Sequence, residues 1–177
     1  VPILQSKVLE QATGTRLSML DSMNLWIEIA KEDLLSVMKR VDLIIINDGE
    51  VRMLAEDDNL IRASRTLIEM VGCQTLIIKK GEHGVVAFHD GEIISLPAYP
   101  TENIVDPTGC GDSFAGTIAA FLASNDGKLT RNELREALVR ATVTASFTLE
   151  SFGTSGLLAL DNEMFSSRLN EFEAMLT

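Results

Sequence analysis

Short apolar runs alternate with longer stretches of helical periodicity along this chain. Residues 41–46 form the clearest buried-strand pattern, and residues 17–20 and Thr75–Lys79 resemble it in length and composition. Apolar residues recur at three- and four-residue spacing over residues 31–39 and 60–71, which is typical of helices that bury one face. Strands and helices therefore alternate, and this order predicts an α/β fold with a mostly parallel sheet covered by helices on both sides.

The second half of the chain predicts a hairpin followed by helices. Two strand patterns, residues 85–88 and Glu92–Leu96, flank an Asp90-Gly91 pair that favours a two-residue turn. Residues 113–123 are apolar on nearly every face, which predicts a buried helix. Two further helices are predicted by their caps: one begins at the capping box of Thr130 and Glu133, and the last begins at Asp161.

Composition and charge narrow the class of protein. Of 177 residues, 46% are hydrophobic and 23% are charged, as in ordinary globular proteins, so residues 1–177 are predicted to form one domain or the larger part of one. The net charge of −11 argues against a nucleic-acid partner, because phosphate backbones are bound mainly by lysine and arginine. No apolar run approaches the ~18 residues of a membrane-spanning helix, so no membrane partner is expected. Two cysteines outside any Cys-x-x-Cys pair indicate a reducing, cytoplasmic setting without zinc.

Several conspicuous side chains are interpreted as packing or surface residues. His83 and His89 do not lie at a spacing typical of a metal site or a catalytic triad, and both are expected at the surface. Cys73, beside a glycine at a predicted helix end, is expected to be a buried structural thiol. Methionines such as Met23 and Met70 are interpreted as core fillers.

The stretch most informative about chemistry is Val-Asp-Pro-Thr-Gly-Cys-Gly-Asp-Ser-Phe-Ala-Gly over residues 105–116. Gly109 and Gly111 flank a small residue where the buried helix is predicted to begin, so successive N–H groups are exposed at its positive end, which favours phosphate. A carboxylate in the same turn, Asp112, opposes anion binding alone but suits a base that takes a proton from an attacking hydroxyl. The simpler alternative is a glycine turn that only lets strand and helix pack closely.

This stretch resembles the Asp-x-Thr-Gly-x-Gly-Asp-[Ser/Thr]-Phe signature of the ribokinase-like (PfkB) carbohydrate kinases and matches it throughout. The resemblance implies that Asp112 is the general base. It also implies that the amides of residues 109–112 form an anion hole for the transferring γ-phosphoryl group, with Gly109, Cys110 and Gly111 among them. The family usually has alanine where Cys110 stands, and cysteine is small enough to fit.

A second match concerns magnesium. Asn47 and Glu50 directly follow the strand pattern of residues 41–46 and resemble the family's Asn-x-x-Glu motif, which organises Mg²⁺ and phosphate largely through water. Asparagine followed three residues later by glutamate is also a helix-capping pattern, here before a helix predicted over residues 49–55. The position of the pair relative to Asp112 favours the metal-organising function.

Further matches imply contacts with the nucleotide. Lys79, Gly81 and Gly84 lie in a strand-turn-strand pattern that resembles the turn passing beneath the nucleotide in the family. A glycine turn in a hairpin is common by itself, and one of Lys79 and Lys80 is expected to be a solvated flank.

The resemblance also implies a monovalent-cation site. Asp106 and Thr108 stand where some family members arrange a site for a cation such as K⁺. Gly153 lies in a loop that resembles the one near the adenine and cation sites. Thr142 stands where some members have an adenine-contacting asparagine.

Taken together, the resemblance implies a phosphotransferase with a three-layer α/β/α ribokinase-like fold, which passes the γ-phosphoryl group of ATP to a sugar hydroxyl with Mg²⁺ as cofactor. It covers nearly the whole chain but only the C-terminal part of the family's domain, so the fold is expected to be incomplete, without the N-terminal strands and the lid. The chain by itself is expected to show little activity, and a homodimer is expected of the intact protein. Two alternatives stay open: a nucleoside acceptor such as adenosine, and a regulatory nucleotide-binding protein without catalysis.

Overall fold

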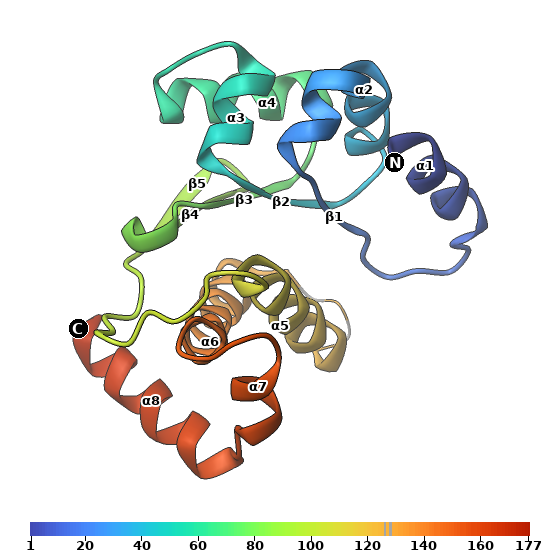
Figure 1. Ribbon diagram of the computed structural model, residues 1–177. Coiled ribbons are helices and arrows are strands. Elements are labelled where there is room, and N and C mark those ends of the chain that lie inside the picture. The colour runs from blue at the N-terminus through green and yellow to red at the C-terminus, as the bar shows by residue number, and fades with distance from the viewer. Residues whose placement is uncertain (126, 128) are drawn as a thin grey trace. The chain divides into compact units, whose positions relative to one another are not determined.

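The computed structural model describes residues 1–125, 127 and 129–177 and divides the chain into two compact units (Figure 1). The first, here called the sheet unit, comprises Val1–Lys80 and Val86–Ile94. The second, the helical unit, comprises Gly81–Val85 and Ser95–Thr177. No helix in these described ranges is long and apolar enough to cross a membrane.

Five strands form one mixed sheet, in the order β1 (Met19–Asp21), β2 (Leu43–Asn47), β3 (Thr75–Lys79), β4 (Val85–His89) and β5 (Glu92–Leu96). β1, β2 and β3 pair in parallel, with Leu20 opposite Ile44 and Ile44 opposite Leu76. The first four residues of both β2 and β3 are buried. Burial on both faces explains why these strands read as continuous apolar runs rather than as alternating patterns.

The predicted hairpin is confirmed. β4 and β5 are neighbours in the sheet and are joined by two residues. Asp90 and Gly91 both have positive φ, 48° and 81°. Two successive left-handed residues form the turn whose twist suits a tight hairpin, and aspartate followed by glycine adopts it at low cost.

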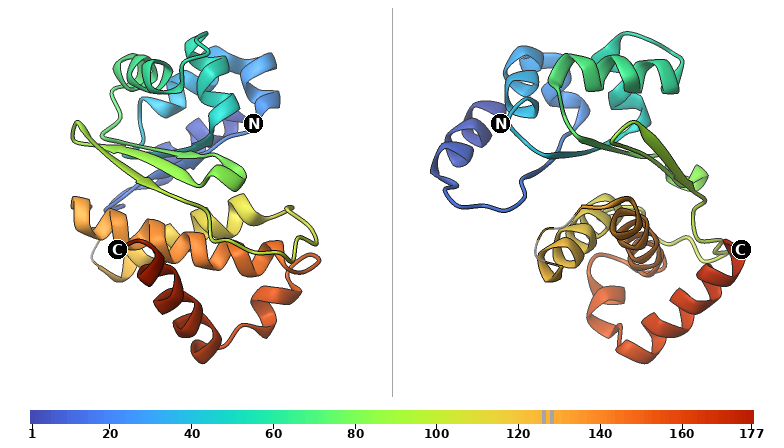
Figure 2. Two further views of the ribbon diagram at one scale, coloured as in Figure 1. Left: turned by 90° about the vertical axis from the view of Figure 1, so that its left-hand side faces the viewer. Right: turned by 180° about the vertical axis from the view of Figure 1, so that it is seen from behind.

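Helices α2, α3 and α4 lie over one face of the sheet (Figures 1 and 2). In α4, Ala63, Leu67 and Val71 are buried at four-residue spacing, as the sequence pattern predicts. The helix begins where Asn59 Oδ1 accepts from the Arg62 N–H at 3.0 Å. The helices of the sheet unit are α1 (Pro2–Gln11), α2 (Asn24–Met38), α3 (Asp48–Ala55) and α4 (Leu60–Val71).

The helical unit is built around one long helix. It contains the short 3₁₀ turn η1 (Gly81–His83) and the helices α5 (Cys110–Ser124), α6 (Arg131–Leu149), α7 (Ser155–Ala159) and α8 (Asn162–Met175). α6 packs against α5, α7 and α8, and α5 runs beside it (Figure 2). Both predicted caps are confirmed: Thr130 Oγ1 accepts from Glu133 N at 3.4 Å, and Asp161 Oδ1 accepts from Met164 N at 2.8 Å.

The prediction that residues 113–123 form a helix buried on nearly every face is wrong. Only Phe114, Ile118 and Leu122 are buried along α5, at four-residue spacing, whereas Ala119 and Ala120 are exposed. Alanine adds little apolar surface, so a helix face made of small residues can meet solvent at little cost.

Some smaller expectations are also corrected. His89 is buried rather than at the surface, with 3% exposure, and its Nδ1 lies 2.8 Å from Thr75 Oγ1, which satisfies the ring inside the sheet unit. Met23 and Met70 are exposed and do not fill the core. Cys73 is buried, as expected, and burial raises the pKa of its thiol to about 11.

Element boundaries differ from the sequence patterns near the N-terminus. The strand expected at residues 17–20 lies at Met19–Asp21, and α2 begins at Asn24, well before the helix expected over residues 31–39. α2 contains a kink at Ala30, whose φ of −151° is not helical. This break explains why one continuous helical period does not run through the element.

Candidate active site

The first turn of α5 exposes backbone N–H groups. Gly109 precedes the helix with φ 86°, and no side chain of residues 1–125, 127 and 129–177 caps this end. The Cys110 N–H donates to the Pro107 carbonyl at 3.2 Å, whereas the N–H groups of Gly111 and Asp112 have no hydrogen-bond partner among the described residues. Unpaired amides at the positive end of a helix favour a phosphate oxygen. The predicted amides are thus brought together, with that of Cys110 already engaged.

Asp112 lies in that same turn. Its side chain is exposed and forms no hydrogen bond or ion pair within the described part of the chain. A general base must keep a lone pair available for the proton it takes, and no cation or hydrogen-bond donor of the described residues blocks this carboxylate.

Contacts with α6 hold the beginning of α5. Thr148 Oγ1 donates to Ser113 Oγ at 2.9 Å, and Ser113 Oγ donates to the Cys110 carbonyl at 3.1 Å. The Cys110 thiol donates to the Ala145 carbonyl at 3.6 Å, and burial raises the pKa of that thiol. A Cβ on Gly109 would lie 3.7 Å from Thr148 Cγ2, so the positive φ rather than crowding requires glycine there.

Asp106 shapes the loop before α5. Its Oδ1 accepts from the Thr108 N–H at 2.9 Å, and hydrogen bonds from Thr108 hold the pKa of the Asp106 carboxyl below its ordinary value. The N–H groups of Val105 and Asp106 donate to the Leu149 carbonyl at 3.0 and 3.2 Å. The resulting Asx turn directs the chain toward Gly109 and brings the Asp106 and Thr108 residues together.

Asn47 and Glu50 form the capping box that the sequence left as the alternative. Glu50 N donates to Asn47 Oδ1 and Asn47 N donates to Glu50 Oε2, both at 2.8 Å, at the beginning of α3. Glu50 is 2% exposed, and burial raises the pKa of its carboxyl. The helix-capping function is therefore confirmed, and a contribution to magnesium binding stays a prediction.

Lys79 pairs with a residue that sequence reasoning missed. Its Nζ lies 2.8 Å from Asp21 Oδ2, with side-chain exposures of 21% and 33%. Asp21, Asn47 and Lys79 end the parallel strands β1, β2 and β3. Ligands of open α/β sheets bind at the carboxyl ends of such strands. A charged residue at the end of an apolar strand was the available signal for Asp21.

The three predicted glycines differ in what they require. A Cβ on Gly84, whose φ is 81°, would lie 2.1 Å from the Leu96 carbonyl oxygen, so the close approach of the chain's own backbone requires glycine there. Gly81 and Gly153 have φ of 56° and 61° with open space around the missing Cβ. Their conformation, rather than close packing, favours glycine.

Protein ligands alone do not assemble a metal site here. Among the described residues, no group of three or more histidine, cysteine, aspartate or glutamate side chains is arranged to hold a metal ion. Mg²⁺ keeps several waters and binds through one or two carboxylates plus substrate phosphates, so a shared site of that kind still fits Glu50 and Asn47. These two residues belong to the sheet unit, whereas residues 105–116 belong to the helical unit.

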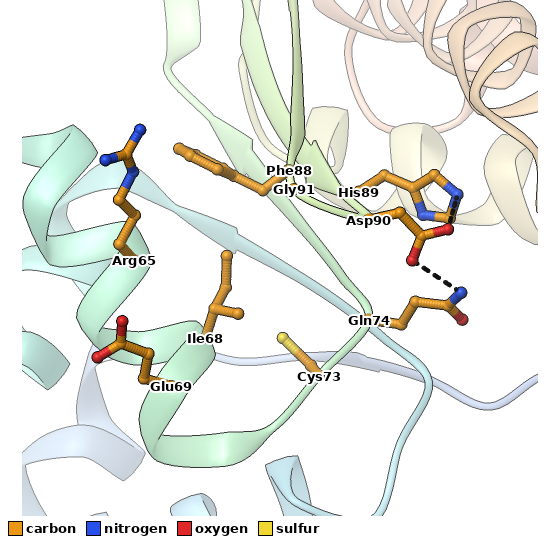
Figure 3. Close-up of a pocket in the computed structure, with 9 residues that line it drawn as sticks. All are labelled: Arg65, Ile68, Glu69, Cys73, Gln74, Phe88, His89, Asp90 and Gly91. Atoms are coloured by element: carbon orange, nitrogen blue, oxygen red, sulfur yellow. Dashed lines mark hydrogen bonds and ion pairs between the residues drawn. The ribbon is translucent and has the colours of Figure 1, made fainter.

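A separate cavity of about 300 Å³ lies in the sheet unit between α4 and the β4–β5 turn (Figure 3). Ile68, Cys73 and Phe88 contribute its apolar wall. The Gln74 amide donates to Asp90 Oδ1 at 3.1 Å at one side. The cavity lies beside the beginning of β3, whereas Lys79 is the last residue of that strand. None of the predicted site residues lines it.

Sequence comparison gives a family match and several relatives. The model of the pfkB family carbohydrate kinases matches residues 6–159. A cytidine kinase of Thermococcus kodakarensis is 36% identical over 117 residues, which are 64% of this chain and 40% of that protein. A fructokinase-2 of Oryza sativa subsp. japonica is 33% identical over 112 residues, 63% of this chain and 33% of that protein. The chain thus spans less than half the length of these two relatives.

Solved structures show the same fold. A nucleoside kinase of Methanocaldococcus jannaschii superposes with a TM-score of 0.72 at 24% identity, over 97% of this chain and 54% of that chain. A ribokinase of Arabidopsis thaliana in complex with ribose and ATP gives 0.74 at 20% identity, over 96% and 53%. The fold therefore matches about half of each of these kinases.

Proposed function

The chain belongs to the pfkB family of carbohydrate kinases, and from that premise we propose that it transfers the γ-phosphoryl group of ATP to a sugar hydroxyl, with Asp112 as general base. The observation that carries the proposal is the first turn of α5, where the Asp112 carboxylate and the amides of Gly111 and Asp112 have no partner in the described part of the chain. Because the chain spans about half the length of its structural relatives, this activity is proposed for the whole protein. We also propose that the whole protein has the complete three-layer α/β/α fold.

In the proposed reaction, Asp112 takes the proton of the attacking hydroxyl. The N–H groups of Gly111 and Asp112 donate to the oxygens of the transferring group, where negative charge develops. Gly109, with its left-handed φ, turns the chain into the first turn of α5, where these amides lie. The Cys110 N–H contributes chiefly by closing that turn onto Pro107.

The remaining site residues bind cofactors in this proposal. Asn47 and Glu50 hold Mg²⁺ through water, and bound Mg²⁺ supplies positive charge beside the phosphates. The Lys79 ammonium breaks its ion pair with Asp21 and contacts a phosphate of the nucleotide. The nucleotide and a monovalent cation such as K⁺ are bound by residues of the helical unit, namely Gly81, Gly84, Asp106, Thr108 and Gly153.

The test is ATP consumption by the whole protein with Mg²⁺ across a panel of pentoses, hexoses, keto-sugar acids and nucleosides. Asp112→Asn should lower turnover by about a hundredfold or more while nucleotide affinity stays near normal. Asp161→Asn is the matched control, because asparagine caps α8 as well as aspartate does. Nearly full activity of the Asp112→Asn variant contradicts the assignment.

A nucleoside acceptor is the second candidate, favoured by the 36% identity to a cytidine kinase. The same panel separates the two, because only one class of acceptor should support turnover. Nucleotide binding without turnover on any acceptor would instead indicate a regulatory protein.

A further inference from the structure

Arg168 of α8 is held by four partners in the helical unit. Its Nη2 donates to Glu150 Oε2 at 2.9 Å and its Nη1 to Ser146 Oγ at 3.0 Å. The guanidinium also lies 3.7 Å from the ring centroid of Phe147 and 5.0 Å from that of Tyr99. Planar stacking and a fork of donors are the properties that distinguish arginine from lysine.

Glu150 connects this arginine to the segment that precedes α5. While Oε2 accepts from Arg168, Oε1 accepts from Thr101 Oγ1 at 2.7 Å. The Arg168 and Glu150 side chains are each only 19% exposed. Loss of one partner leaves a largely buried charge without compensation, so the remaining carboxylate must move or take up water.

The same end of α6 also contacts the segment through its backbone. The Leu149 carbonyl, one residue before Glu150, accepts from the Val105 and Asp106 N–H groups. Segment 101–106 is thus attached at Glu150 and at Leu149. Three residues after Asp106 comes Gly109, which precedes α5, and the unpaired amides among the described residues follow at Gly111 and Asp112.

We propose that Arg168 is a positioning residue for the phosphate-binding turn, acting through Glu150 and Thr101 on residues 106–112. The inference rests on the proposed function for its kinetic consequence. In structural terms, the Arg168 guanidinium holds the C-terminal end of α6 in place, and that end holds the segment of residues 101–106 that leads into α5. Groups that hold a transition state must be placed to within a fraction of an ångström, so a distant anchor affects rate.

Arg140 provides a matched control. It forms an ion pair with Glu136 at 3.0 Å and lies 5.5 Å from the Phe121 ring centroid. It therefore has the same two kinds of contact as Arg168, on the same helix bundle, without reaching segment 101–106. Arg168→Met and Arg140→Met remove equivalent groups from different places.

Two kinetic results are expected from the whole protein. Arg168→Met should lower kcat by about tenfold to a hundredfold with a smaller change in the KM for ATP, because the amides matter most in the transition state. Arg140→Met should leave both constants unchanged. Thr101→Val removes the hydroxyl that donates to Glu150 and that also accepts from the Asn103 N–H at 3.1 Å. It should reproduce the direction of the Arg168 effect, and the double variant should be no worse than Arg168→Met alone.

A second readout does not depend on activity. Cys110 begins α5, so the rate at which a maleimide labels its thiol, measured on its own peptide by mass spectrometry, reports the placement of the turn. Arg168→Met should accelerate labelling several-fold in the folded protein, and Arg140→Met should not.

Unchanged labelling and kcat in Arg168→Met, or equal effects in the two arginine variants, would overturn the inference. If the wild-type protein turns over no acceptor, the proposed function fails, and the labelling rates still decide whether Arg168 positions the turn. Addition of the Arg168 and Thr101 effects in the double variant would show that the two residues act independently.

Discussion

The Lys79 ammonium lies 2.8 Å from the Asp21 carboxylate and joins the ends of β1 and β3 across β2. Asn47 ends β2 between them, opposite Lys79 in the sheet register. Both charges also act on the buried Glu50 carboxyl: the Asp21 charge raises its pKa and the Lys79 charge lowers it. At the C-terminal ends of these parallel strands, the charges of Asp21, Lys79 and Glu50 therefore influence one another.

Lys79→Met is expected to weaken ATP binding. A charge-assisted contact with a phosphate contributes about 1.5–3 kcal/mol, so KM for ATP should rise by about tenfold or more. Lys80→Met, at the neighbouring position, should leave KM unchanged. Steady-state kinetics of the whole protein provide the measurement, and equal KM values for both variants would remove Lys79 from the nucleotide site.

The pH dependence of stability should change when Glu50 is replaced. Burial raises the pKa of Glu50 above 4.5, so the folded state binds its proton more tightly than the unfolded state. The contribution of the protonated Glu50 carboxyl to stability is fully present below pH 4.5, and it is lost as the pH rises through the folded-state pKa. Glu50→Gln should therefore flatten the fall in unfolding free energy on going from acid to neutral pH.

Glu56→Gln is the control for that experiment. The hydrogen bond from Lys31 lowers the pKa of the exposed Glu56 carboxyl, so its small contribution is lost on acidification, the opposite direction. Urea unfolding at a series of pH values measures both. A Glu50→Gln protein with the wild-type pH profile would contradict a raised pKa.

Gly84→Ala is expected to be strongly destabilising. The added Cβ would meet the Leu96 carbonyl oxygen at 2.1 Å and would also sit at positive φ, so we expect a loss of about 3 kcal/mol or more. Gly81→Ala carries only the cost of positive φ, about 1 kcal/mol, because no atom of the described residues lies within 4 Å of the added Cβ. Urea unfolding measures the unfolding free energy of both variants. Equal losses of unfolding free energy would show that the backbone near Leu96 moves to make room for the added Cβ.

Leu67→Ala should destabilise the sheet unit by about 2–5 kcal/mol, because its side chain is fully buried and leaves a cavity. Ile61→Ala, on the same helix but 40% exposed, should cost far less. Thermal or urea unfolding monitored by circular dichroism distinguishes them. A small loss for Leu67→Ala would mean that the core between α4 and the sheet collapses around the cavity.

Local chemistry explains which parts of the fold were predictable. The β4–β5 turn follows from Asp90 and Gly91, because a two-residue turn with positive φ needs such residues. The capping boxes at Thr130 and Asn47 follow from side chains only three residues apart. Burial of His89 could not be predicted, because its partner Thr75 lies on a different strand.

The candidate site divides in the same way. Residues 105–116 and the Asn47–Glu50 pair are recognisable in sequence, because each group is contiguous and its backbone geometry is local. Asp21, Thr148 and Arg168 were missed, since each acts on a residue far along the chain. Sequence alone determined the order of the strands and of most helices, the glycine turn before α5 and the carboxylate in it, through short-range hydrogen bonding and steric preference. Only the tertiary structure decided which charges pair and which helix end anchors the turn, because those contacts depend on how distant elements pack.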